Sequence, residues 1–252
     1  MKKLPLCVLA LVLVVALYLA GCASSPGGGS RIIPHPYTGD RTKTTLENGG
    51  FEQWLQGWYI LSGEAFTPAV IADSGQTFWG ERDFMAVGER FLNGYENPEK
   101  ATGVLASAMF TLAGDGYISF LMGGSRTNRC FISIHTEDGR EIARHTNVRN
   151  FRDPEMSLNM NRVYMHLPNF IGQVLYIQLN DNDNRDGDFA AMTADDFIVS
   201  MTEADVKAMM VSTYNKIMAL EDIAINRYIK HFYRTKRYPF PLEEVLASFS
   251  VQ

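Results

Sequence analysis

The stretch FTLAGDGYISFLMGG, residues 110–124, constrains the fold more than any other part of the chain. Its two apolar runs flank AGDG at residues 113–116, a combination typical of a strand, a tight turn and a second strand. Similar short runs, rich in aromatic and β-branched residues and separated by Gly, Asn or Asp, recur over residues 46–200. Many short strands with closely spaced turns predict a mainly β protein, a two-sheet jelly-roll β-sandwich rather than a parallel α/β sheet.

Individual strands and one hairpin can be placed within this region. The dipeptide DG at 138–139 is typical of a two-residue hairpin turn with positive φ. That turn would pair residue 135 with residue 142, so His135 and His145 would not lie opposite each other, and no zinc site is expected. The expected strands are residues 58–62, 65–71, 84–87, 103–112, 117–122, 130–136, 141–145, 162–166, 174–180 and 196–200.

After residue 200 the apolar residues recur with the period of a helix. Thr202 and Asp205 resemble a capping box, and apolar side chains then follow at spacings of three and four as far as Phe232. We expect one long C-terminal α-helix from Thr202 to about residue 234, about 50 Å in length. Its broad apolar face could cover the sandwich, a second copy of the chain or a partner protein.

The N-terminus resembles a bacterial lipoprotein signal. Two lysines precede the uncharged apolar run 4–20, and small residues lead to Cys22. The resulting organisation is a signal peptide over residues 1–21, a lipidated (palmitate-carrying) Cys22, a flexible tether over 22–43, a sandwich over 44–201 and a helix with a tail over 202–252. The folded domain would then lie outside the cytoplasm, in the cell envelope, held to the membrane by its lipid. An uncleaved transmembrane anchor is the alternative.

The net charge limits the classes of binding partner, and the cysteine content limits the thiol chemistry. Without residues 1–21 the chain has 21 Lys and Arg, two fewer than the 23 of the full sequence, against 28 Asp and Glu, a balance of −7. That sign argues against a nucleic-acid partner. Cys130 would be the one unmodified cysteine left, within the apolar run CFISI, so we expect a buried core residue rather than a reactive thiol.

Several segments together carry a family resemblance. NGGFE at 48–52, GEAF at 63–66, TGVLASAMFTL at 102–112 and TADDFIVS at 193–200 resemble galactose-binding-like jelly-roll modules, including carbohydrate-binding modules. In this order they are similar to the accessory β-sandwich of bacterial levanases and β-fructosidases. The resemblance implies glycan binding, of fructan-type polymers in particular.

The same resemblance implies that the chain is not an enzyme. Glycoside hydrolysis needs two carboxylates at a fixed separation. In the resembled family these come from an Asn-Asp-Pro motif and a Glu-Cys motif, and neither string occurs here. The family's Arg-Asp-Pro motif has one match, at residues 152–154, which we interpret as a polar loop. The alternative to glycan binding is a structural or assembly lipoprotein that contacts proteins through its sandwich and helix.

Candidate ligands of a metal and of a sugar complete the sequence predictions. The resemblance implies a structural Ca²⁺ held by Glu52 and Asp196, whereas the acidic run 180–188 lacks the pattern of a helix-loop-helix calcium loop and is interpreted as turns. Sugar binding needs an aromatic platform with fixed polar groups, and Trp54 and Trp58 are expected in the core. The candidate sugar-binding residues, each with a structural role in its loop as the alternative, are Trp79, Arg82, Arg126, Asp183 and Asp186.

Overall fold

The two apolar runs of residues 110–124 lie in different sheets in the computed structural model of the chain. β7 (Phe110–Thr111) pairs with β12 (Val174–Asp181), whereas β8 (Tyr117–Gly124) lies between β11 (Asn161–His166) and β13 (Met192–Met201). The Gly116 N–H donates to the Ala113 carbonyl (3.1 Å) and closes the expected turn. This turn therefore carries the chain from one sheet to the other.

The structure describes residues 34–78, 82–125, 127–147, 159–185 and 190–250. Met1–Pro34 and His35–Gln252 form separate units, and the two sheets and the C-terminal helices belong to the second unit. The Arg-Asp-Pro match at 152–154 and the expected lipidation site Cys22 lie outside the described residues.

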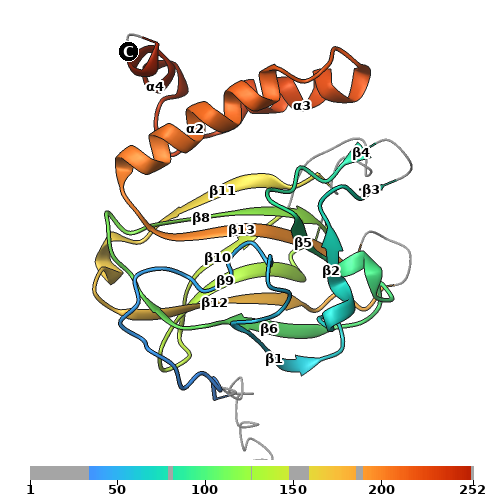
Figure 1. The fold of residues 1–252 in the computed structure, drawn as a ribbon, viewed down its shortest axis with the longest axis vertical. Coiled ribbons are helices and arrows are strands. Elements are labelled where there is room, and N and C mark those ends of the chain that lie inside the picture. The colour runs from blue at the N-terminus through green and yellow to red at the C-terminus, as the bar shows by residue number, and fades with distance from the viewer. Residues whose placement is uncertain (1–33, 79–81, 126, 148–158, 186–189, 251–252) are drawn as a thin grey trace, which may run out of the picture. The chain divides into compact units, whose positions relative to one another are not determined.

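Two antiparallel sheets form the sandwich (Figure 1). Sheet A has the order β1-β6-β12-β9-β10, with β7 beside β12, and sheet B has the order β11-β8-β13-β5-β2. The expected two-sheet sandwich is therefore confirmed. The remaining strands are β1 (Trp58–Gly63), β2 (Ile71–Asp73), β3 (Thr77–Phe78), β4 (Arg82–Asp83), β5 (Arg90–Asn93), β6 (Gly103–Ser107), β9 (Cys130–Thr136) and β10 (Glu141–Thr146). Short 3₁₀ turns lie at Pro68–Val70, Gly94–Glu96 and Pro168–Phe170.

Every residue of β8 is buried, which explains its uninterrupted apolar sequence. Ile118 and Phe120 belong to the core between the two sheets. Tyr117 belongs instead to a cluster with Val206 and Met210 of the C-terminal helix α2 (Glu203–Met218). A strand covered on both faces has no solvent face and so no alternation of apolar and polar residues.

Some expected strands are wrong. Residues 65–70 hold a 3₁₀ turn that begins at Pro68, and residues 84–87 pair with no strand although Phe84 is 3% exposed. Residues 103–112 form two short strands, and β13 starts four residues before the expected position. Burial alone does not require a strand ladder. Trp58 is in the core as expected, but Trp54 is 51% exposed in the turns that precede β1.

The β9–β10 hairpin has a different turn from the expected one. The Gly139 N–H donates to the Thr136 carbonyl (2.8 Å), the Thr136 N–H donates to the Arg140 carbonyl (3.0 Å), and only Gly139 of the DG pair has positive φ. This is a three-residue loop whose glycine forms a bulge. It pairs His135 with Glu141 rather than with residue 142, and His145 lies opposite Ile132, so the two histidines are apart as expected.

The single long helix is wrong, because the chain turns back after α2. α3 (Ala224–Thr235) and α4 (Leu242–Phe249) follow, and Ile217 packs with Ile229 and Tyr233 of α3. In one straight helix Ile217 and Tyr233 would lie about 24 Å apart. The Lys230 ammonium donates to the Leu220 carbonyl (2.6 Å) and satisfies a carbonyl just beyond the end of α2. Tertiary packing therefore decides where this helical period is broken.

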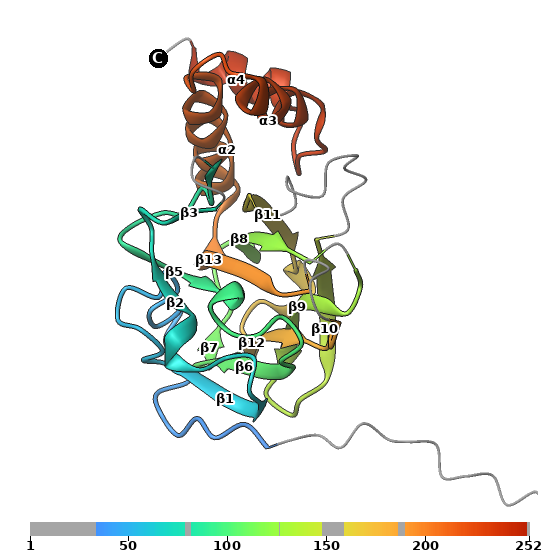
Figure 2. The ribbon, with the colours of Figure 1, turned by 90° about the vertical axis from the view of Figure 1, so that its right-hand side faces the viewer.

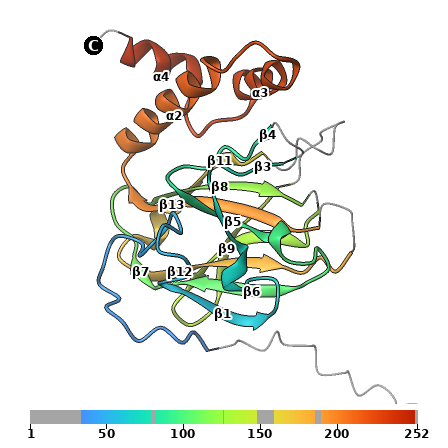
Figure 3. The ribbon, with the colours of Figure 1, turned by 45° about the vertical axis from the view of Figure 1, so that its right-hand side comes forward.

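The helices cover the outer side of sheet B, away from sheet A (Figures 2 and 3). Val206 and Met210 are fully buried there, so the apolar face of α2 packs on its own sandwich. The expected capping box is present, because Thr202 and Asp205 exchange hydrogen bonds. In the part of the chain that the structure describes, no helix is long and apolar enough to cross a bilayer.

The end of the expected tether packs on the sandwich. His35 contacts the Ser107 carbonyl through Nε2 (2.9 Å), Tyr37 is 5% exposed, and the Thr111 N–H donates to the Lys43 carbonyl (2.8 Å). The tether boundary expected at residue 43 is therefore wrong. The folded unit begins at about residue 35.

Candidate functional site

The loop residues expected to bind a sugar can be placed only in part. Trp79, Arg126 and Asp186 lie outside the described residues, and only the backbone of Arg82, in β4, is described. The remaining candidate, Asp183, follows β12 and is fully buried.

The carboxylate of Asp183 is occupied by its own chain. Arg185 donates from Nε (2.8 Å) and Nη2 (2.7 Å), and Thr127 donates from Oγ1 (2.9 Å). Arg185 first and then Thr127 lower the pKa of Asp183 to about 2, against the opposing effect of burial. Asp183 thus joins the loop after β8 to the loop after β12, so it has the structural role that was the alternative to sugar binding.

The expected calcium pair does not fit a shared cation. Both carboxylate oxygens of Glu52 accept the Glu89 N–H (3.0 and 3.1 Å). Asp196 instead forms an ion pair with Arg162, so a cation at Asp196 would face a guanidinium. Calcium held by Glu52 together with Asp196 is therefore not supported.

The neighbouring Asp195 is a better partner for Glu52. Both carboxylates lie close to Gly50, because a β-carbon placed on Gly50 would be 3.8 Å from Glu52 Oε1 and 3.9 Å from Asp195 Oδ1. Asp195 is fully buried, and burial raises its pKa to about 8 although the Val87 N–H donates to it (2.8 Å). Glu52 and Asp195 are the carboxylates that a calcium ion in this place would meet, and Asp195 Oδ1 already accepts the Asp196 N–H (2.6 Å). Within the described ranges, no three His, Cys, Asp or Glu residues gather as a metal site.

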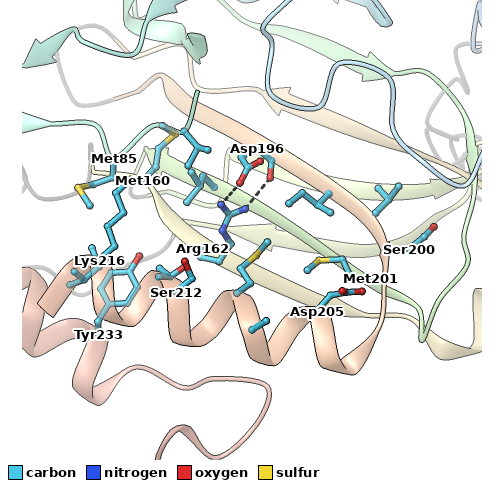
Figure 4. A pocket seen from close by; sticks show the side chains of 18 residues that line it. Met85, Met160, Arg162, Asp196, Ser200, Met201, Asp205, Ser212, Lys216 and Tyr233 are labelled. Atoms are coloured by element: carbon cyan, nitrogen blue, oxygen red, sulfur yellow. Dashed lines mark hydrogen bonds and ion pairs between the residues drawn. The ribbon is translucent and has the colours of Figure 1, made fainter. Parts of the chain in front are cut away.

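An open groove separates α2 from the outer face of sheet B (Figure 4). It has a volume of about 710 Å³, within the range of about 300–1,000 Å³ found for ligand pockets. α2 forms one wall, β8, β11 and β13 form the floor, and Tyr233 of α3 lies at one end beside Lys216. The groove thus joins parts of the chain that are far apart in sequence.

The helix wall of the groove is a strip of exposed residues. Asp205, Ala208, Ser212 and Lys216 follow one another at spacings of three and four, which places them on one side of α2. The strip is about 16 Å long. The short side chains of Ala208 and Ser212 leave the middle of the wall open, because neither reaches across to the sheet.

The floor of the groove carries a buried ion pair. The Arg162 side chain, on β11, is 5% exposed and donates to the Asp196 carboxylate and, through Nη1, to the Asp196 carbonyl (2.9 Å). The pairing of β13 with β8 shifts register between Asp195 and Ile198, and Asp196 has a φ of 48°. Such bulges re-aim side chains, and this one accompanies the turn of the Asp196 carboxylate toward Arg162.

Two polar atoms of this pair remain unmatched. Arg162 Nε is buried and has no hydrogen-bond partner in the described structure. Asp196 Oδ1 accepts no hydrogen bond from any described residue, and the Asp196 side chain is 24% exposed. The pair therefore has one unused acceptor that borders the groove and one unused donor enclosed beneath it, and an unpaired buried polar group costs about 1–3 kcal/mol.

The rest of the lining is largely apolar. Met85, Met160, Met201 and Met209 contribute flexible thioethers, and Ile198 lies on the floor. Methionine side chains adapt to irregular shapes. Such a lining suits a ligand with an apolar face and hydrogen-bonding edges, since the polar groups fix its orientation.

Sequence reasoning missed this groove. Arg162 was expected only as the first residue of a strand, and Asp196 was assigned to calcium. The available signal was the strip of small or polar residues at 205, 208, 212 and 216 beside the apolar strip of the same helix.

Comparisons with known proteins return distant likenesses. No protein-family model and no curated protein sequence matches the chain. A solved family 61 carbohydrate-binding module in complex with β-1,4-galactotriose is 16% identical, with a TM-score of 0.39, over 61% of this chain and 94% of that one. The K3 cleaved adhesin domain of Lys-gingipain from Porphyromonas gingivalis is 13% identical, with a TM-score of 0.35, over 62% of this chain and 99% of that one.

A family 35 carbohydrate-binding module from an environmental isolate is 12% identical, with a TM-score of 0.27, over 56% of this chain and 89% of that one. At these identities and TM-scores the likenesses carry no argument about what the chain binds. The assignment of function therefore depends on the side chains of the groove.

Proposed function

We propose that the chain is a non-catalytic glycan-binding protein and that the groove between α2 and sheet B holds the sugar. The observation that carries the proposal is the unused donor at Arg162 Nε beside the unused acceptor at Asp196 Oδ1. A hydroxyl group both donates and accepts, so one sugar hydroxyl can donate to Asp196 Oδ1, and a neighbouring hydroxyl can accept from Arg162 Nε once that side chain turns toward the groove.

The dimensions and the other lining groups support the same ligand class. Ser212, Thr213 and Lys216 add donors along the helix wall, and Asp205 adds an acceptor at the opposite end. The methionines and Ile198 would contact the C–H faces of the rings. A groove about 16 Å long suits an oligosaccharide rather than a single sugar.

Calorimetric titration of the full chain against fructans, galactans and cell-wall glycans tests the proposal. We expect heat of binding from at least one glycan. Ser212→Trp fills the groove and should remove that heat, whereas Asn215→Trp, at an exposed position of α2 outside the lining, should leave it unchanged. If no glycan gives heat while circular dichroism shows the native fold, the proposal fails.

Asp196→Asn tests the chemistry of the floor. It keeps the shape of the side chain and removes the charged acceptor, so we expect affinity to fall about tenfold or more, as for hydrogen bonds to charged groups. Unchanged affinity in this variant would show that the sugar does not contact the floor pair.

The finer parts of the proposal are a fructan-type ligand and a lipid anchor. The segment resemblance to levanase accessory modules supports the first, and the apolar run before Cys22 supports the second. Among the neutral glycans of the panel, fructans should bind best. Metabolic labelling with a palmitate analogue should label the wild type and not Cys22→Ser, and equal labelling of both would contradict the anchor.

The alternative role in protein assembly loses its motivating observation. It rested on a broad apolar helix face, and Met210 and Ile217 of that face are buried, at 0% and 1% exposure. Glutamate at these positions would therefore disrupt the fold rather than report on an interface.

A further inference from the structure

A second hollow adjoins the groove at Arg162, which lines both. It has a volume of about 700 Å³ and is bounded by the end of β10, by β11 and by the segment between α3 and α4. We call it the basic pocket, defined by Asn161, Tyr164, Lys236, Arg237 and Tyr238. Glycan binding in the groove makes no use of it.

Aromatic rings surround a fixed cation in the basic pocket. Lys236 Nζ lies 4.8 Å from the ring centre of Tyr238, 5.0 Å from that of Tyr233 and 6.0 Å from that of Tyr164. It also donates to the Arg162 carbonyl (2.8 Å). Cations are attracted to ring faces at these distances, so this positive charge is held in place rather than mobile in solvent.

The second cation of the pocket is not engaged. Arg237 is exposed and forms no ion pair or hydrogen bond with the described residues, and it lines the same hollow. No Asp or Glu occurs among the described lining residues, although the chain as a whole has a net charge of −5. Together the charges of Lys236 and Arg237 favour an anion in this hollow.

The phenols of the pocket stay uncharged donors. The Tyr164 hydroxyl is buried and has no hydrogen-bond partner in the described structure. Burial raises the pKa of Tyr164 and of Tyr238, so neither becomes an anion that would repel a negative ligand. The pocket therefore combines an unsatisfied donor, a fixed ammonium and an unpaired guanidinium.

We propose that the basic pocket binds the carboxylate of an acidic sugar. This inference rests on the proposed function and adds that a glycan with a carboxylate binds tighter than its neutral counterpart of the same sugar and linkage. The planar guanidinium of Arg237 suits a carboxylate in a bidentate arrangement. The Tyr164 hydroxyl donates a further hydrogen bond, and the ring of Tyr238 offers a surface for the C–H face of the sugar.

The test compares uronic-acid oligosaccharides with their methyl esters on the full chain. The two ligands differ in the charge of the carboxyl group and share sugar and linkage. We expect the acid to bind about tenfold tighter or more, as for charged hydrogen bonds. The tighter binding of the acid should largely disappear near 1 M salt, because the electrostatic screening length is then about 3 Å. A sulfated oligosaccharide shows whether another anion replaces the carboxylate.

Two variants locate the effect. Arg237→Ala should remove the preference for the acid, whereas Arg234→Ala, a matched exposed arginine of α3 that does not line the pocket, should keep it. Equal binding of acid and ester overturns the inference, and so does a preference for the acid that survives Arg237→Ala. If neutral glycans still bind in these cases, the proposed function stands. If no glycan of any kind binds, both fail.

Discussion

The buried carboxylate of Asp181 gives the protein a pH dependence that can be measured. Asp181 is 2% exposed at the end of β12 and accepts hydrogen bonds from Cys130 Sγ (3.2 Å) and from the Asp183 N–H (3.1 Å). Burial raises its pKa from 3.8 to about 7. The native state therefore keeps a proton on Asp181 over a pH range in which the unfolded chain has lost it.

The sign and size of the effect come from this difference. Because the raised pKa favours the protonated native state, the stabilisation is complete below about pH 4 and is lost as the pH rises through about 7. Each pH unit in this window changes the free energy of unfolding by about 1.4 kcal/mol. Between about pH 5 and about pH 8, roughly two of these units apply, so the wild type loses about 3 kcal/mol through Asp181.

Urea unfolding of the wild type and of Asp181→Asn, at about pH 5 and about pH 8, measures this contribution. Asparagine has the shape of the protonated carboxyl group and does not ionise. The stability of the variant relative to the wild type should therefore rise by about 3 kcal/mol between the two pH values. Taking the difference between variant and wild type cancels the other titrating groups. A difference that does not change with pH would refute the reasoning.

Three further predictions concern other parts of the fold. Calcium should raise the melting temperature of the wild type but not of Asp195→Asn, and equal rises would exclude Asp195 as a ligand. Tyr233 is 3% exposed and packs with Ile217. Tyr233→Ala should therefore destabilise the protein by about 3 kcal/mol and speed amide exchange in α3. Unchanged exchange would contradict this packing. Burial raises the pKa of the Cys130 thiol, so Cys130 should not react with a thiol reagent in the folded protein. Wild type and Cys130→Ser should therefore show the same number of reactive thiols when native, and numbers that differ by one when unfolded.

The strands that the sequence predicts well have clear local signals. β9 has the expected bounds, Cys130 to Thr136, because turn-forming residues flank an apolar run on both sides. The Thr202–Asp205 capping box is equally local, since both partners lie within one helical turn. Such features need no knowledge of distant contacts.

The break in the C-terminal helix has no such signal. No glycine or proline lies between Met218 and Ala224. The helix ends because Ile217 packs against Ile229 and Tyr233 when α3 folds back. A contact made only in three dimensions decides this boundary, and the helical period alone does not predict it.

The groove depends on strand register, which the sequence does not specify on its own. Arg162 lies opposite Leu121 in the pairing of β11 with β8, and Leu121 lies opposite Asp195 in the pairing of β8 with β13. This register, together with the bulge after Asp195, places Arg162 beside Asp196, 34 residues away in the chain. A shift of one residue in either pairing would turn these side chains to the other face.

Hydrogen–deuterium exchange with and without the best-binding glycan tests the central claim most directly. If the sugar lies in the groove, amides of α2 and of β13 should exchange more slowly in the complex, and the change should be absent in Ser212→Trp. Protection confined to the loops around Asp183, or to the outer face of sheet A, would place the sugar elsewhere and contradict the account.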